Sequence, residues 1–91
     1  MLNYKQFERK EGKQNMSVIY DYSKLRGRII EKYGTVARFS QFLDVSKSTV
    51  SLKLNNKVDI SRDDIIKWSK ILDISPSDYG AFYFVQKLND V

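Results

Sequence analysis

A short run of hydroxyl and ammonium side chains between positions 46 and 53 is the part of this sequence best suited to a chemical contact. Ser46 is expected to be the N-cap of a helix, because its side-chain oxygen can accept a hydrogen bond from a backbone N–H of the first turn. The outer side of that helix would carry a small polar surface with a cation at each end, formed by Lys47, Ser48, Ser51, Leu52 and Lys53. Such a helix suits insertion into the major groove of a duplex.

A second short helix is expected immediately before this one. Read with a helical period, positions 35 to 43 place four side chains on one inner side, namely Val36, Phe39, Ser40 and Leu43. A sharp break follows at Asp44, and Val45 is expected to lie inside the corner. The later helix turns Val50 and Leu54 toward the same core. The two helices form a predicted helix-turn-helix.

A preceding helix is expected over positions 21 to 33. Asp21 would be its N-cap, Gly34 would end it, and Thr35 would cap the next helix. The apolar period places five side chains on its inner side, namely Tyr22, Leu25, Ile29, Ile30 and Tyr33.

Two more helices are expected after the turn at positions 55 to 57. Ser61 begins the first of them with an acidic first turn, and Trp68 is expected in its buried face. Positions 72 to 75 then repeat the phrase of positions 43 to 46, a leucine, an aspartate, a β-branched residue and a capping serine. Pro76 occupies the favoured first position of a last helix that would end near Phe82. The sequence therefore predicts a compact all-α domain of five short helices.

The segment from Tyr79 to Leu88 carries more large apolar groups than one short helix can hide. Some of Phe82, Phe84, Val85 and Leu88 are expected to close the core of the domain. The others could form a patch for a partner or for a second copy of the chain.

Composition limits the classes of function. The 91 residues contain no cysteine and no histidine, which excludes a zinc finger, a thiol nucleophile and a histidine-based triad. No cluster of acids suggests a metal site, so neither catalysis nor a metal or other cofactor is expected. No apolar run approaches the roughly 18 residues of a membrane span, and a cytoplasmic location is expected.

The net charge of +5 is unevenly distributed. Positions 24 to 57 contain eight cations and two acids, which gives this segment a net charge of +6, whereas positions 58 to 91 contain four cations and six acids. The positive half contains the predicted helix-turn-helix, and a phosphate backbone is a natural partner for such a half.

The first sixteen residues are interpreted as an arm outside the domain, which would then span 17 to 91. Positions 1 to 15 have mixed charge and no apolar period. Lys10-Glu11-Gly12 can be encoded by purine-rich codons like a bacterial ribosome-binding sequence, so a working start at Met16 is a hypothesis for genomic DNA to test. The alternative is a basic arm that lies along DNA.

The chain resembles the Cro/repressor family, the XRE-type lambda-repressor-like helix-turn-helix proteins, and in particular small lytic-switch regulators of temperate phages of Gram-positive bacteria. The resemblance covers about positions 18 to 80 and is most specific between 35 and 57. Eight residues match the family pattern, namely Thr35, Leu43, Val45, Ser46, Thr49, Ser51, Asn55 and Lys57. Phe39 and Val50 are apolar equivalents. Departures from the pattern are Val36, Ser40, Asp44, Leu52 and Asn56.

This resemblance implies DNA-contacting roles for individual positions of the helix-turn-helix. Base edges would be contacted by Lys47, Ser48, Ser51 and Leu52. Phosphates would be contacted by Thr35, Arg38, Ser46, Thr49, Lys53, Asn55 and Lys57. For Ser46 the alternative is N-capping alone, and for Leu52 it is packing or a protein contact. The implied function is a Cro-like transcriptional repressor that binds operator DNA as a dimer, which could form only on DNA.

A second hypothesis keeps the fold and changes the partner. The chain would be a modulator or antirepressor that binds another phage regulator, such as a repressor, through its helix-turn-helix face or its aromatic C-terminal tail. Leu52 in an otherwise polar face favours this hypothesis.

Overall fold

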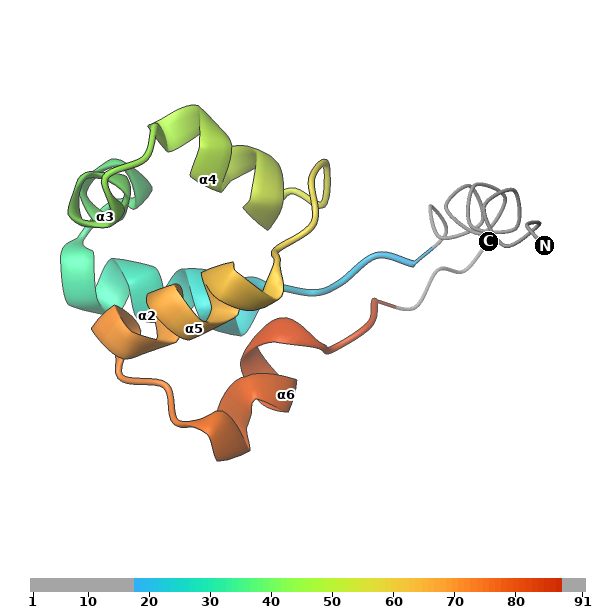
Figure 1. The fold of residues 1–91 in the computed structure, drawn as a ribbon. Coiled ribbons are helices and arrows are strands. Elements are labelled where there is room, and N and C mark those ends of the chain that lie inside the picture. Colours follow the sequence, from blue (N-terminus) through green and yellow to red (C-terminus); the bar gives the residue numbers. More distant parts are fainter. Residues whose placement is uncertain (1–17, 88–91) are drawn as a thin grey trace, which may run out of the picture.

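The computed structural model describes residues 18–87, and the interpretation of residues 1–16 as an arm lies outside this range. The described chain is all-α, as predicted, with helices α2 (Ser23–Tyr33), α3 (Val36–Leu43), α4 (Lys47–Leu54), α5 (Arg62–Leu72) and α6 (Tyr79–Tyr83). A 3-10 turn, η1 (Pro76–Asp78), precedes α6. In Figure 1, α2 and α5 lie between the α3–α4 pair and α6. No helix of the described part is long and apolar enough to span a bilayer.

The helix ends follow the chemistry of their capping residues. The side chains of Thr35, Ser46 and Ser61 each accept a hydrogen bond from the backbone N–H three residues later, at 3.0 to 3.1 Å. α2 begins at Ser23, two residues after the expected cap, although the Asp21 carboxylate still accepts a hydrogen bond from the Ser23 N–H at 2.9 Å. Local capping rules therefore place most of the helices correctly.

Left-handed backbone ends two of the helices. Asp44 after α3 and Asp73 after α5 have φ values of 64° and 56°, and Gly34 after α2 has 85°. Asn56, in the turn after α4, has a φ of 62°. Aspartate and asparagine tolerate this region better than other non-glycine residues, so Asp44 and Asn56, which stand where the family pattern has glycine, leave their turns intact.

The core is formed by one inner face of each helix. Phe39 of α3 and Trp68 of α5 meet edge to face with ring centroids 5.3 Å apart. Ser40 is also buried, and its hydroxyl donates to the Val36 carbonyl at 2.8 Å, which satisfies its polar group. The other large side chains of this core include Leu25, Ile29, Val50, Leu54, Ile65, Leu72 and Ile74.

The prediction that Ile30 and Val45 face the core is wrong. Ile30 is 48% exposed and Val45 is 42% exposed. Ile30 lies at the edge of the apolar side of α2, where no neighbouring element of the described chain covers it. Val45 lies at the corner of the helix-turn-helix and faces outward rather than into the core.

The aromatic tail is divided between core and surface. Phe82 and Tyr83 are buried, whereas Phe84 and Val85 are about half exposed. The Asp21 N–H donates to the Val85 carbonyl at 2.7 Å, and the Lys87 N–H donates to the Ile19 carbonyl at 2.8 Å. The two ends of the described chain therefore leave the domain side by side as antiparallel segments (Figure 1). Leu88 lies outside the described residues.

Candidate protein-interaction surface

The outer side of α4 presents the side chains that were expected there. Lys47 and Ser48 are exposed, Ser51 is partly buried, and Leu52 is 45% exposed. The predicted base-reading positions therefore share an accessible surface, and an aliphatic group lies within it.

Most of the predicted phosphate contacts already have partners within the domain. The oxygens of Thr35 and Ser46 cap α3 and α4, and the Ser46 hydroxyl also lies 2.9 Å from that of Thr49. The Asn55 side-chain oxygen accepts a hydrogen bond from Arg26 at 2.9 Å. These side chains make hydrogen bonds within the domain. N-capping, the alternative role given above for Ser46, is therefore observed for both Ser46 and Thr35.

Lys53, another predicted phosphate contact, also has a partner within the domain. Its ammonium group lies 2.7 Å from the Asp64 carboxylate, and both side chains are only 18% exposed. The same carboxylate oxygen accepts a hydrogen bond from the Ser61 N–H at 2.9 Å, which completes a capping box at the start of α5. Burial opposes ionisation of Asp64, but the hydrogen bonds from Lys53 and Ser61 outweigh it and hold its pKa below the ordinary value of 3.8. The pair fastens α4 to α5.

Replacing Asp64 with alanine is expected to lower the free energy of unfolding by about 2 kcal/mol at pH 7, because it removes a helix cap and leaves Lys53 without its partner. A lowered pKa gives stability that is present above the unfolded value near pH 4 and is lost as the pH falls through the folded pKa. Urea denaturation at pH 7 and near pH 3 should therefore show a difference between wild type and variant that shrinks in acid. Asp63→Ala, an exposed change in the same turn, should cost less than about 0.5 kcal/mol. Equal losses for the two variants would contradict this role.

Other cations of the positive half are also engaged. Arg28 donates to the carbonyls of Leu72 and Asp73 at 2.7 and 3.1 Å, and Lys32 pairs with the Asp73 carboxylate. Lys24 and Arg28 both lie about 5 Å from the centre of the Phe82 ring. Of the eight cations between positions 24 and 57, those for which the structure gives no such contact are Arg38, Lys47 and Lys57. The positive charge of this half is thus used largely to join helices.

The helix-turn-helix also exposes apolar groups, of which only Leu52 was expected to contact a partner from the sequence. Phe42 of α3 is 65% exposed and rests against Tyr33, with ring centroids 4.8 Å apart. Val45 of the turn and Leu52 of α4 are also close to half exposed. The helical period could have indicated Phe42, because it falls outside the inner side formed by Val36, Phe39, Ser40 and Leu43. We call Phe42, Val45 and Leu52 the apolar trio.

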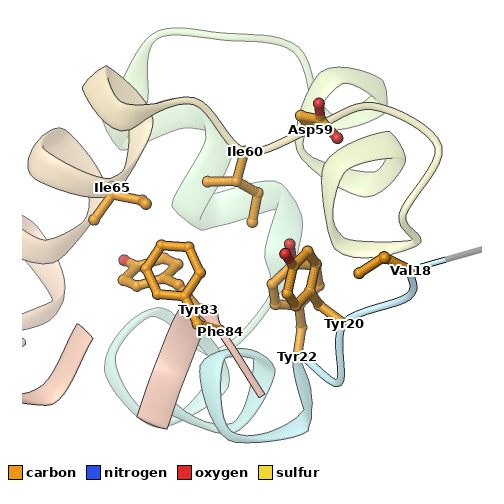
Figure 2. A pocket seen from close by; sticks show the side chains of 8 residues that line it. All are labelled: Val18, Tyr20, Tyr22, Asp59, Ile60, Ile65, Tyr83 and Phe84. Atoms are coloured by element: carbon orange, nitrogen blue, oxygen red, sulfur yellow. The ribbon is translucent and has the colours of Figure 1, made fainter. Parts of the chain in front are cut away.

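A pocket of about 300 Å³ lies beyond the C-terminal end of α4. Figure 2 shows Tyr20 and Tyr22 on one side of it and Tyr83 and Phe84 on the other, with Asp59 at the rim. Burial raises the pKa of Tyr22 to about 12, with smaller contributions from Tyr20 and Asp59. At neutral pH, therefore, this phenol is uncharged. This pocket could not be predicted from the sequence, because its walls come from segments far apart in the chain.

Comparison with a solved structure identifies a regulator that shares this fold. The chain is 45% identical to the modulator of repression (MOR) of the temperate bacteriophage TP901-1 from Lactococcus lactis, with a TM-score of 0.66. The match covers 71% of this chain and 88% of that one. No curated protein sequence matches the chain.

These findings correct the interpretation drawn from the family pattern. The Cro/repressor assignment is wrong, and so is the function of an operator-binding, Cro-like repressor that it implied, because the matching protein is a modulator of repression. The pattern is dominated by caps, turns and core positions, which specify the fold and not the partner. The engaged side chains of Lys53, Asn55 and Thr49 agree with this correction. The family model that matches residues 17–86 is described as a protein of unknown function, DUF739, and the chain belongs to that family.

Proposed function

We propose that this protein modulates repression in a temperate phage by binding a repressor protein directly. The observation that carries the proposal is the 45% identity, over 71% of the chain, to a modulator of repression. A binding function of this kind needs no catalytic group and no cofactor, which is consistent with a sequence that lacks cysteine and histidine.

The helix-turn-helix face is the surface that we assign to the repressor. The apolar trio is exposed there, and Lys47 and Arg38 add cations that the structure leaves without described partners. Aromatic and aliphatic groups surrounded by polar ones are typical of protein interfaces, whereas a DNA-reading surface depends on available cations. The aromatic tail is less suited to this role, because Phe82 and Tyr83 are already buried in the core.

The proposal is tested by mixing the full chain with the repressor encoded in the same genome. Size-exclusion chromatography with light scattering should show a complex whose mass contains both proteins. The chain alone should bind duplexes from the regulatory region weakly, with no sequence preference, and should lose that binding between about 50 and 200 mM salt. Tight, sequence-selective binding of DNA by the chain alone, with no repressor complex, would reject the proposal.

A further inference from the structure

The pocket beside α4 has walls that are mainly aromatic. Four rings line it, and the other lining groups are three aliphatic side chains and one carboxylate. The Tyr20 ring lies 6.0 Å from that of Tyr22 and 6.2 Å from that of Phe84, centre to centre, and Tyr83 lies 6.5 Å from Phe84. The faces of aromatic rings carry negative electrostatic potential, so a cavity with such walls favours a cation.

The charge at the rim points to the same class of ligand. Asp59 is exposed, and it is the one charged residue among the eight that line the pocket. Burial is the main cause of the raised pKa of Tyr22, and the Asp59 carboxylate adds the smallest contribution to it. Figure 2 shows the hydroxyl ends of Tyr20 and Tyr22 lying together and pointing toward the segment that carries Asp59. A cationic head group placed there would meet a carboxylate and ring faces at once.

The loop after α4 connects the proposed repressor surface to the residues that line the pocket. The carbonyl of Leu52, a member of the apolar trio, accepts hydrogen bonds from the N–H groups of Lys57 and Val58 at 2.8 and 3.3 Å. Asp59 comes directly after Val58. The Asn56 side chain holds the Tyr20 backbone through two hydrogen bonds of 2.9 Å each, so the loop after α4 and the wall of the pocket form one unit. A protein lying across α4 can therefore reach the pocket.

We infer that this pocket binds a cationic side chain, an arginine or a lysine, that the partner protein inserts against the accessible rings of Tyr20 and Phe84 and pairs with Asp59. The inference rests on the proposed function only in assigning that side chain to a repressor. The volume of about 300 Å³ is at the small end for ligand sites, which suits one side chain and not a larger cofactor.

The test begins without any repressor. Full-length protein is titrated with N-acetylarginine methylamide and, separately, with the citrulline analogue, which replaces the guanidinium with a neutral urea group. Ring resonances of Tyr20, Tyr22 and Tyr83 should shift with arginine at lower concentrations than with citrulline. Asp59→Asn should weaken arginine binding about threefold to fivefold, whereas Asp63→Asn, an exposed aspartate on α5, should leave it unchanged.

Each result decides a separate point. Equal binding of arginine and citrulline, or an Asp59→Asn variant that binds arginine as wild type does, would overturn the inference. Either result would mean that the pocket does not select for positive charge. Nuclear Overhauser contacts in the free protein between these rings and the chain's own lysines or arginines outside 18–87 would identify an internal occupant and also overturn it. Arginine selectivity together with no repressor complex would reject the proposed function while supporting the cation site. When a complex forms, Asp59→Asn should weaken it by a similar factor and Asp63→Asn should not.

Discussion

Replacing Phe42 with alanine and Leu52 with serine in one variant is expected to weaken the complex with the repressor about 100-fold, which corresponds to about 3 kcal/mol. Phe42 is 65% exposed and Leu52 is 45% exposed in the free protein, so each can bury apolar area against a partner. An aromatic residue at the centre of a small interface is often one of its dominant contacts. Isothermal titration of the repressor with wild-type and variant chains measures the change.

This prediction requires that the variant remain folded. Phe42 contacts Tyr33 but is 65% exposed, so we expect its loss to lower the free energy of unfolding by no more than about 1 kcal/mol. Ile30→Ser is a matched control, because Ile30 is 48% exposed on α2, outside the helix-turn-helix. If Ile30→Ser weakened the complex as much as the double variant, the assigned surface would be wrong.

The second large effect is expected in alkali, where the domain should lose about 5 kcal/mol of stability between pH 9 and pH 12. Burial raises the pKa of both Tyr22 and Tyr83 from 10.0 to about 12. A raised pKa means that the folded state binds the proton more tightly than the unfolded state. The associated stability is therefore complete below the unfolded value near 10 and is lost as the pH rises toward the folded value. Each tyrosine contributes about half of this loss.

Urea denaturation followed by circular dichroism at several values between pH 8 and pH 11.5 measures this loss. Lysines also titrate in this range, so the informative quantity is the difference between wild type and Tyr83→Phe. That variant should be about 1 kcal/mol less stable at pH 8, because it removes a buried 2.9 Å hydrogen bond to Ser69. Its further loss in alkali should be about half that of wild type. Parallel stability curves for the two proteins would show that the Tyr83 phenol is not protected by burial.

The local chemistry of the helices could be predicted from sequence. Capping by Thr35, Ser46 and Ser61 depends on side chains within three residues of the group that they satisfy. The left-handed turns at Asp44 and Asp73 depend on the conformational freedom of single residues. Interactions between residues this close in the chain can be predicted from a single sequence, and they suffice to identify the helix-turn-helix.

The two copies of the Leu-Asp-β-branched-Ser phrase show where such reasoning fails. Val45 and Ile74 donate the same kind of hydrogen bond, to the carbonyls of Ser40 and Ser69, each at 3.0 to 3.1 Å. Their local backbones are therefore alike, yet Val45 is 42% exposed and Ile74 is 5% exposed. The difference comes from the next elements of the chain, because α6, which follows η1 after Ile74, returns to pack against α2. Tertiary neighbours of this kind cannot be inferred from the phrase itself.

The function could not be predicted from counted charges for a related reason. A count of positive charges treats Arg28, Lys32 and Lys53 as available to bind DNA phosphates. In the folded domain each of them instead joins two helices. Their partners are 11 to 45 residues away in the chain. Leu52 favoured a protein partner from the sequence, and the exposure of Phe42 and Val45 is consistent with that hypothesis. The pocket around Tyr83 remained hidden because its walls are assembled from both ends of the described chain.

The central claim is that a helix-turn-helix surface here binds a protein. Nuclear magnetic resonance of isotope-labelled full-length chain, titrated first with unlabelled repressor and then, in a separate sample, with duplex from the regulatory region, tests it most directly. We predict saturable shifts for α3, α4 and the loop to Asp59 with the repressor, and only small, salt-sensitive shifts with the duplex. Saturable shifts along α4 with one duplex sequence, and none with the repressor, would contradict the account.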